Sequence, residues 1–410
     1  MMNILHTSDW HIGRTLFGRK RYGEFALFLN WLLTTIEQYR IEVLIVAGDI
    51  FDTTTPSNRA QQLYYQFLQG AAASCCRHVI LIGGNHDSPS LLEAPKELLR
   101  FFQVHVVGSA TENPVDEVIT LTDADGEDEL IVCAVPYLRD RDIRTARAGE
   151  TQDDKTLSLI RGISEHYRQV AEIAEERRRQ TRGKPPIVAT GHLFAAGSKK
   201  VEGDGVRDLY IGSLVHLDAA CLPESFSYLA LGHLHTAQMV GGNPARRYCG
   251  APLPMSFGEA ARQKHVLVVT IDNDTAGVEA VPIPCFQQLR TVRGDLPDIL
   301  AEIEALKTEP DAVWLEVIYD GREIVTDLPF TLREAVAGTS LEILRMVNNR
   351  LTARVLEQNY PRETLETMTE EAVFLRCLEA QQVPDSQRDE LMDIFRETVQ
   401  AIAEEDLQAE

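Results

Sequence analysis

Five short motifs, each placed directly after an apolar run, constrain this chain more than any other feature. The motifs are Ser8-Asp9-Trp10-His11, Gly48-Asp49, Gly84-Asn85-His86-Asp87, Gly191-His192 and Gly232-His233-Leu234-His235. The apolar runs include residues 43–47, 79–82, 187–190 and 228–231, and such runs are typical of strands buried on both faces. Sites in open α/β sheets form at the carboxyl ends of strands, so we expect the five motifs to meet in one place.

The residue types in these motifs predict a metal centre. Side chains alternate along an extended chain, so Asp9 and His11 point to the same side. His233 and His235 do so for the same reason. Carboxylate oxygens and imidazole nitrogens without sulfur suit divalent Mn, Fe, Zn or Mg. Two such ions, ~3.5–4 Å apart, clamp a phosphate and acidify an attacking water. They need one shared carboxylate, and Asp49 is the best candidate.

Any one of these motifs alone is weak evidence for a site. An Asp-x-His or Gly-His pair arises easily by chance, and a single histidine is usually structural. The ordered recurrence of all five motifs after apolar runs is what favours chemistry. For the other histidines, at positions 6, 78, 105, 166, 216 and 265, we expect structural roles.

The first 285 residues alternate strand-like runs with helix-like segments, a pattern that predicts an α/β layered domain. Helices are expected at 25–38, 59–73 and 156–180. A hairpin formed by 265–271 and 278–284 closes the domain.

The pattern of predicted helices and strands changes after residue 285. A helical segment at 296–306 and alternating segments at 313–319 and 341–347 predict a small α+β domain over residues 286–350. Residues 351–410 then predict a tail with a pair of helices. The second of these helices has an apolar stripe, formed by Leu391, Ile394, Phe395, Val399 and Ile402.

The net charge of −22 argues against a broad nucleic-acid-binding surface. Residues 286–410 carry 12 Lys and Arg against 27 Asp and Glu, so −15 lies there and −7 in residues 1–285. Composition alone therefore favours a small substrate. A polyanionic substrate would need bound cations, local Arg clusters or a partner protein to attract it.

The cysteines and the apolar runs bear on the compartment. The seven cysteines are scattered, odd in number and never spaced as C-x-x-C. That pattern is typical of a reduced, cytoplasmic protein without a thiolate zinc site. No run approaches the ~20 apolar residues of a membrane helix, and no secretory signal is visible.

The five motifs, in this order, resemble those of calcineurin-like metallophosphoesterases. Segments 4–13, 48–52, 207–212 and 247–257 are also similar to the SbcD family, the nuclease subunits of bacterial SbcCD complexes. The similarity covers most of residues 1–285 and, more loosely, the C-terminal part. It implies a layered α/β sandwich of two β-sheets flanked by helices, a DNA-facing α+β capping domain at 286–350 and a C-terminal helical pair in 351–410.

The resemblance also implies roles for single residues. One Mn²⁺ would be held by Asp9, His11, Asp49 and His235, and a second by Asp49, Asn85, His192 and His233. His86 matches the histidine that stabilises the phosphorane or protonates the leaving 3′-oxygen. Asp87 would orient the ring of His86 from behind.

The resemblance implies an activity and partners as well. The activity would be metal-dependent hydrolysis of DNA phosphodiesters, as a 3′–5′ exonuclease on duplexes and an endonuclease on single strands and hairpins, in DNA repair, recombination and replication. The chain would form a homodimer within a heterotetramer with an SbcC-type ATPase. Helices near 59–73 and 91–102 are candidate dimer interfaces, but core packing needs apolar helix faces as well. The chain contains no G-x-x-x-x-G-K-[ST] motif, so ATP dependence would come from that partner.

Candidate contacts to DNA lie in three basic clusters, and those to the ATPase lie in the C-terminal tail. Arg14, Arg19, Lys20 and Arg21 follow the first motif, and we expect phosphate contacts there, although solvated surface charge explains them equally well. Arg139, Arg141 and Arg144, and then Lys199 and Lys200, are weaker candidates. The tail would dock its apolar stripe, Leu391, Phe395, Val399 and Ile402, onto the coiled coil of the ATPase, or else pack on its own domain.

Two other functions fit part of the sequence. A phosphoprotein or small-nucleotide phosphoesterase would suit the acidic charge, but it would not need the capping domain and the tail. A scaffold that organises an ATPase without catalysis would not need a complete ligand set. We therefore expect a DNA nuclease.

Overall fold

The fold is described from a computed structural model. It describes residues 1–144, 150–195, 222–321, 323, 325 and 327–349. Seven further positions of the C-terminal segment are described, namely Phe374, Leu375, Leu378, Arg388, Leu391, Met392 and Phe395. The chain divides into two units, Met1–Gln287 and Gln288–Glu410. Each unit is considered by itself.

The first unit contains a six-stranded sheet in the order β14-β13-β1-β4-β5-β6. Strands β1, β4, β5 and β6 are parallel, whereas β13 and β14 form an antiparallel hairpin at one edge. The strands span β1 Met2–Thr7, β4 Val43–Ala47, β5 His78–Ile82, β6 Val104–Val107, β13 His265–Asp272 and β14 Thr275–Pro282. The carboxyl ends of β1, β4 and β5 therefore lie at the same edge.

A second six-stranded sheet has the order β11-β12-β10-β9-β8-β7. Strands β8, β9, β10 and β12 are parallel, and β7 and β11 are antiparallel to their neighbours. The strands span β7 Val118–Thr122, β8 Asp128–Cys133, β9 Ile187–His192, β10 Tyr228–Gly232, β11 Gln238–Val240 and β12 Asn243–Tyr248.

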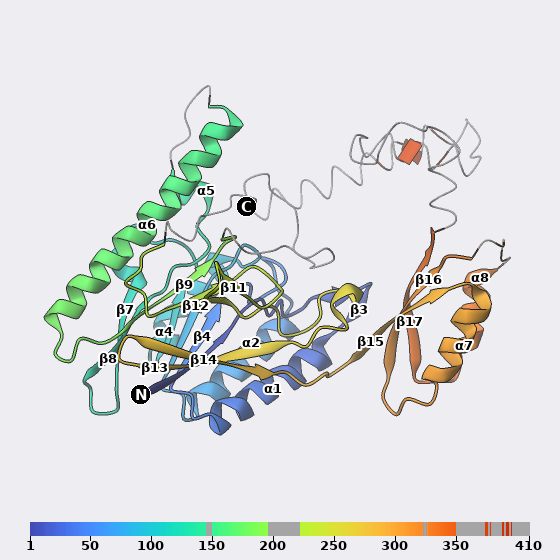
Figure 1. The fold of residues 1–410 in the computed structure, drawn as a ribbon, viewed down its shortest axis with the longest axis horizontal. Helices are drawn as coiled ribbons and strands as arrows, with labels where there is room; N and C mark the ends of the chain where they lie inside the picture. Colours follow the sequence, from blue (N-terminus) through green and yellow to red (C-terminus); the bar gives the residue numbers. More distant parts are fainter. Residues whose placement is uncertain are drawn as a thin grey trace. The chain divides into compact units, whose positions relative to one another are not determined.

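Alternating side chains assign each strand residue to one of three cores. Ile45 of β4 and Ala230 of β10 belong to the core between the two sheets. Leu44 and Val46 of β4 point the other way, into a core that the helices α1 and α2 cover. Leu229 of β10 faces a third core, which also contains residues of α6. Figure 1 shows α6 running beside β7 and β9 of this sheet. Strands that are buried on both faces read as continuous apolar runs, which is the pattern seen in the sequence.

The helices of the first unit cover the outer faces of the two sheets. In α1, Phe25, Phe28, Leu32 and Ile36 are buried at helical spacing on one face. Helix α6 begins with a capping box in which Thr151 and Asp154 bond each other's backbone amides. The helices span α1 Tyr22–Gln38, α2 Asn58–Ala72, α3 Pro89–Glu93, α4 Lys96–Arg100, α5 Asp140–Ile143 and α6 Gln152–Gln180, with short 3₁₀ turns at Pro114–Glu117 and Phe257–Glu259.

The second unit begins with a β-α-β-α-β arrangement in which β16 lies between β15 and β17 and all three strands are parallel. Val313, Leu315 and Val317 of β16 pack with helix residues such as Ile299 and Leu332. The elements span β15 Gln288–Gly294, α7 Leu296–Leu306, β16 Val313–Tyr319, α8 Leu328–Val336 and β17 Leu341–Asn348.

The predicted fold class is confirmed: two sheets are flanked by helices, and a smaller α- and β-containing unit follows. Helix α6 begins four residues earlier than the predicted 156–180, because Thr151 caps it. Strand β15 and helix α8 were not predicted. Over the described residues, no helix combines the length and apolarity that a membrane span requires.

The described residues of the C-terminal segment bear on the predicted partner-binding stripe. Leu391 and Phe395 are helical and half-buried. The ring of Phe395 stacks on that of Phe374, with 4.2 Å between the ring centroids. Val399 and Ile402 lie outside the described residues, as do Lys199 and Lys200.

Candidate metal centre and active site

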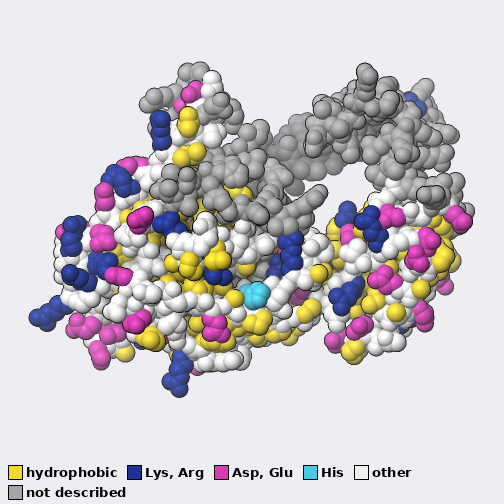
Figure 2. Space-filling view, in the orientation of Figure 1, with side chains coloured by type: hydrophobic (Ala, Val, Ile, Leu, Met, Phe, Trp, Pro, Cys, Tyr) yellow, Lys and Arg dark blue, Asp and Glu magenta, His cyan; other side chains and the backbone are white. Residues whose placement is uncertain are grey.

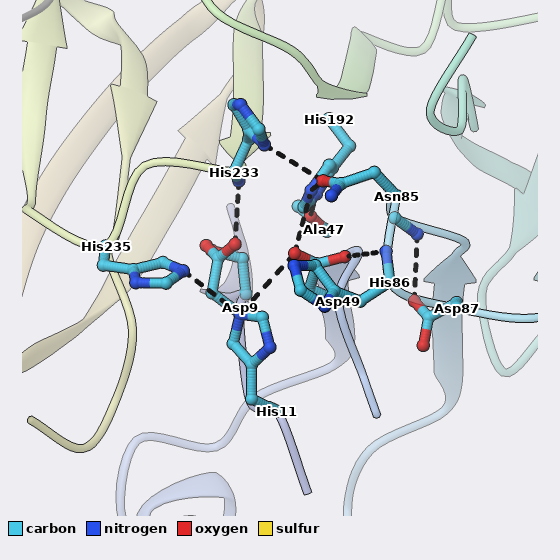
Figure 3. A network of polar contacts seen from close by, with 12 residues as sticks. Asp9, His11, Ala47, Asp49, Asn85, His86, Asp87, His192, His233 and His235 are labelled. Carbon is cyan, nitrogen blue, oxygen red and sulfur yellow. Dashed lines mark hydrogen bonds and ion pairs between the residues drawn. The ribbon is translucent and has the colours of Figure 1, made fainter. Parts of the chain in front are cut away.

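The five motifs converge at the carboxyl ends of five parallel strands (Figure 3). Asp9 and His11 follow β1, Asp49 follows β4, and Asn85 and His86 follow β5. His192 ends β9, and His233 and His235 follow β10. The first three strands belong to one sheet and the last two to the other, so both sheets contribute to the site.

One group of ligand atoms is formed by Asp9, His11 and His235, which lie within 4.8 Å of one another. The Nε2 atoms of His11 and His235 are 3.1 Å apart. Nε2 of His11 is also 3.5 Å from Oδ2 of Asp49. All four side chains are buried. Either one imidazole donates to the other across this contact, or both Nε2 atoms present their lone pairs to a cation bound beside them.

A second group surrounds the side-chain oxygen of Asn85. This Oδ1 atom lies 3.0 Å from Nε2 of His192 and 3.1 Å from Nδ1 of His233. Nε2 of His192 is 3.3 Å from Oδ2 of Asp49. Nδ1 of His192 donates to the carbonyl of Ala47 at 2.9 Å, which leaves Nε2 as the nitrogen that can bind a metal.

The carboxylate of Asp49 connects the two groups. Its Oδ2 atom faces His11 in the first group and His192 in the second. Its Oδ1 atom accepts a hydrogen bond of 2.9 Å from the backbone amide of His86. One oxygen therefore fixes the orientation of the carboxylate, and the other lies where a shared ligand is needed.

The electrostatics of the site are those of a cation-binding centre. Burial raises the pKa of Asp9 to about 7 in the absence of a cation. Burial also raises the pKa of Asp49, but the nearby His192, His86 and His11 outweigh it and hold this pKa well below its usual range. Asp49 and Asp9 in turn raise the pKa of His192 to about 9, against the effect of burial.

Burial favours the neutral imidazole in the other three histidine ligands. Burial lowers the pKa of His233 to about 3, and it lowers the pKa values of His11 and His235 as well. A neutral imidazole is the form that binds a metal. Oxygen and imidazole donors gathered around buried carboxylates therefore fit divalent ions of the Mn, Fe or Zn type.

The backbone of the site is held in an uncommon conformation. Asp9, His11, Asp49 and His233 have φ angles of 52°, 48°, 50° and 95°, in the region that residues other than glycine seldom occupy. Hydrogen bonds of 3.0 Å between the loops after β1 and β4 hold two of these turns, from Asp9 N to Gly48 O and from His11 N to Asp49 O. Strain of this kind persists where the surrounding structure enforces it, and it concentrates at functional sites.

Gly84 is required by the close approach of the loop after β5 to Asp49. A Cβ atom on Gly84 would lie 2.1 Å from Oδ1 of Asp49 and 2.3 Å from its backbone nitrogen. Any side chain at position 84 would therefore displace the shared carboxylate.

The expected contact between Asp87 and His86 is replaced by another arrangement. The buried carboxylate of Asp87 accepts hydrogen bonds of 2.9–3.1 Å from three backbone amides, those of Gly84, Ile50 and Phe51. Asp87 therefore joins the loops after β4 and β5. The ring of His86 is oriented by the carbonyl of Asp52, which accepts from Nδ1 at 2.9 Å. The chain turns between residues 86 and 87, so adjacent side chains point apart.

Asp52 was not predicted as a site residue, yet it contacts three functional candidates. Besides the bond to His86, its Oδ1 atom lies 3.4 Å from Nδ1 of His11 and 3.1 Å from an Nη atom of Arg14. Burial raises the pKa of Asp52, but His11 and Arg14 outweigh it and lower the pKa to about 2. The spacing Gly48-Asp49-x-x-Asp52 was the available signal.

The four basic residues after the first motif have different environments. Arg19 and Lys20 are exposed on β3 (Arg19–Lys20), which pairs with β2 (Thr15–Leu16) in a hairpin. Arg14 is half-buried beside Asp52. The guanidinium of Arg21 is buried and donates to both carboxylate oxygens of Glu24 and to the carbonyl of Pro254. Arg21 therefore has a structural role in the interior, and its guanidinium cannot contact DNA.

The second basic cluster is largely neutralised by its own neighbours. Arg144 pairs with Asp140 and Glu150, and Arg141 lies 3.7 Å from Asp142. Arg139 is the exception, because its guanidinium lies 6.0 Å from the ring centroid of Tyr137 and 3.5 Å from the backbone carbonyl of Asp87, and neither contact neutralises its charge. We retain neither Arg141 nor Arg144 as a principal DNA contact.

Comparison with known proteins agrees with the fold. Residues 2–237 match the family model described as calcineurin-like phosphoesterase, and residues 285–382 match one described as type 5 capsule protein repressor C-terminal domain. The first match covers more than half of the chain and contains every candidate ligand. The chain belongs to the calcineurin-like phosphoesterases.

Individual relatives place the chain more narrowly. It is 35% identical to the SbcD subunit of the SbcCD nuclease of Escherichia coli (strain K12), over 98% of this chain and 99% of that protein. It is 33% identical to the Rhodobacter capsulatus protein of the same name, over 91% and 93%, and 34% identical to that of Bacillus subtilis, over 65% and 66%. Within the phosphoesterases, the chain therefore falls in the SbcD family.

Proposed function

We propose that this chain is the nuclease subunit of an SbcCD-type complex and hydrolyses DNA phosphodiesters at two Mn²⁺ ions. Asp9, His11, Asp49 and His235 would hold one ion, and Asp49, Asn85, His192 and His233 the other. The observation that carries the proposal is the pair of ligand groups that share Oδ2 of Asp49. When bound, two such ions clamp a phosphate and acidify the attacking water.

His86 is the residue that we assign to the substrate. Asn85 and His86 are half-buried, whereas the other candidate ligands are buried, so the site opens on their side. The carbonyl of Asp52 accepts from Nδ1 of His86, and this leaves Nε2 to face the substrate. From there it would protonate the leaving 3′-oxygen or stabilise the charge of the transition state.

The whole-length similarity to SbcD nuclease subunits favours DNA over a phosphomonoester as the substrate. The proposed activities on DNA are those of a 3′–5′ exonuclease and a hairpin endonuclease. Purified protein with Mn²⁺ is assayed on a labelled hairpin duplex and on p-nitrophenyl phosphate. We expect cleavage of the hairpin and little monoester turnover. Robust monoester turnover with intact DNA would instead establish the small-substrate phosphoesterase.

The mixed surface charge bears on how DNA would be held. On the described part of the face in Figure 2, acidic and basic side chains are interspersed, as the net charge of −22 leads one to expect. Local contacts must therefore position the substrate. The β2–β3 hairpin is our candidate, because it follows His11 directly and exposes Arg19 and Lys20.

Reversing charge on this hairpin tests its role. We expect Arg19→Glu combined with Lys20→Glu to weaken duplex binding and to reduce the slope of log K against log salt by about two. Fluorescence anisotropy at several salt concentrations measures both. Arg161→Glu combined with Arg179→Glu, at exposed positions on α6, is the control with the same change in net charge. An unchanged slope in the hairpin variant would move the DNA contact elsewhere.

An exposed apolar patch supports a homodimer. Leu98, Phe101 and Phe102, at and just after α4, are 62%, 85% and 55% exposed. Large apolar side chains gathered at one place on a surface commonly mark an interface. We propose that two copies of the chain bury this patch against each other.

Charged substitutions in the patch should produce monomers. We expect Phe101→Asp with Phe102→Asp to halve the mass measured by light scattering and to leave the melting temperature of the fold nearly unchanged. Phe330→Asp, on α8 and 66% exposed, is the control. A dimeric double variant would show that the copies meet through another surface.

For the ATPase partner, the tail of the chain remains our candidate, and the unit after residue 285 remains our candidate for a DNA-facing cap. The helical positions of Leu391 and Phe395 are compatible with docking. The stacking of Phe395 on Phe374 supports a helical pair that docks as one body. The assembly would be a heterotetramer of two nuclease and two SbcC-type ATPase subunits.

A further inference from the structure

A largely buried ion pair lies directly behind the candidate ligand His235. The ammonium of Lys264 donates to the backbone carbonyl of His235 at 3.2 Å. It also pairs with the carboxylate of Glu259. The two side chains are 10% and 1% exposed. A buried ion pair is costly to desolvate, so its presence is weak evidence that it stabilises the fold. Its position beside His235 allows a different role.

The segment that begins at His235 is held by further contacts from the same region. The amide of Ala251 donates to the carbonyl of His235 at 3.1 Å. Arg262 donates to the hydroxyl of Thr236 at 3.0 Å. Gly250, with φ of 78°, allows this approach, because a Cβ atom there would lie 2.7 Å from the same carbonyl.

Glu259 keeps Lys264 in this position. Its Oε2 atom accepts both from Lys264 and from the backbone amide of Met255, the latter at 3.3 Å. The carboxylate thus ties the lysine to the loop that precedes the Phe257–Glu259 turn. Two acceptors therefore orient the ammonium, the carboxylate of Glu259 and the carbonyl of His235.

We propose that Lys264, held by Glu259, is a positioning residue for one of the two metal ions. By fixing the backbone of His235, it keeps the imidazole of His235 beside that of His11, where the two Nε2 atoms are 3.1 Å apart. Lys264 acts through this backbone carbonyl and does not bind the metal itself. The inference rests on the proposed function, because it concerns the ion assigned to Asp9, His11, Asp49 and His235.

The positioning role and a purely electrostatic role predict opposite results. An ammonium near a cation site repels the cation, so removing its charge would tighten metal binding. Removing a group that orients a ligand weakens metal binding, by ~10–100-fold in known metal sites. The double variant Glu259→Gln with Lys264→Met preserves the net charge of the pair and removes the side-chain donor to the carbonyl of His235, while the backbone amide of Ala251 still donates to it.

Two backgrounds separate the two metal sites. His233→Ala removes a ligand of the other ion and His235→Ala a ligand of this one, and Mn²⁺ alone is titrated calorimetrically into each. In the His233→Ala background we expect Glu259→Gln with Lys264→Met to raise the Kd of the remaining ion by ~10-fold or more. In the His235→Ala background, we expect less than a twofold change.

Controls keep the inference falsifiable. Lys264→Arg retains a cationic donor and should restore binding to within about threefold of the background. Glu304→Gln with Lys307→Met removes an ion pair on α7 in the second unit and should leave both Kd values unchanged. If the double variant does not fold, Lys264→Met alone in the same two backgrounds gives the comparison, because methionine has no donor for the carbonyl of His235.

If the double variant weakens Mn²⁺ binding equally in both backgrounds, Lys264 has only a general structural role. If Mn²⁺ binding in the His233→Ala background is unchanged or tighter, Lys264 does not position His235. These outcomes are distinct from failure of the proposed function. That failure would be seen in the unsubstituted protein, as fewer than two bound Mn²⁺ or as intact DNA.

Discussion

Replacing Asp49 by Asn should remove both metal ions from the site and lower DNA cleavage by ~10³-fold or more. Oδ2 of Asp49 faces both ligand groups, so the substitution removes a negative charge from each. Asn has the same shape, and its side-chain oxygen can still accept from the amide of His86. We therefore expect the fold to persist.

Metal content after dialysis, measured by mass spectrometry, and cleavage of a labelled hairpin test this prediction. Asp125→Asn, at an exposed turn position, is the matched control and should bind two ions and cleave normally. Loss of only one ion in the Asp49 variant would mean that the carboxylate serves a single metal. Full occupancy would remove Asp49 from the ligand set.

Replacing His86 by Ala should separate metal binding from cleavage. Its ring is held by the carbonyl of Asp52 and is half-buried at the open side of the site. Its backbone amide, which orients Asp49, is unaffected by the substitution. We expect Mn²⁺ affinity to change by less than about threefold, while the cleavage rate falls by ~10²–10⁴-fold, the range for loss of a general acid.

Calorimetric titration of Mn²⁺ and single-turnover cleavage of the hairpin measure the two quantities in the same preparation. Ser88→Ala, two residues away, removes only a helix cap and should retain the full cleavage rate. Full activity in the His86 variant would refute the assigned role. Loss of metal with loss of activity would make His86 a ligand.

The sequence predicted most of the site because its residues lie next to recognisable strands. Each ligand follows an apolar run that is buried on both faces, and parallel strands bring their carboxyl ends together. Chain order alone was therefore enough to place Asp9, Asp49 and His192 in one cluster. Asp49 was the candidate for the shared carboxylate because two metal ions need one, whereas the two four-ligand sets came from the resemblance to the phosphoesterases.

What the sequence could not supply is the direction of side chains in irregular loops. Asp87 follows His86 directly, yet it turns toward backbone amides of the β4 loop. Arg21 resembles its basic neighbours in the sequence, but Glu24, one helical turn later, captures its guanidinium in the interior. The spacing of Asp52 from Asp49 hints at a role, but only the folded chain shows that Asp52 contacts His11 and Arg14.

The pair formed by Lys264 and Glu259 illustrates the same limit over a longer distance. Its target, the carbonyl of His235, is 29 residues away in the chain. Neither residue belongs to a ligand motif, and a lysine five residues after a glutamate is ordinary surface composition. Only the folded chain shows that Glu259 is buried and that Lys264 reaches the segment after β10.

The central claim is that two metal ions lie on either side of Asp49, and anomalous diffraction from crystals grown with Mn²⁺ tests it most directly. Data collected on either side of the Mn absorption edge should give two anomalous peaks, one between His11 and His235 and one beside Asn85, His192 and His233, with Asp49 contacting both. A single peak, or two peaks that do not share Asp49, would contradict this claim.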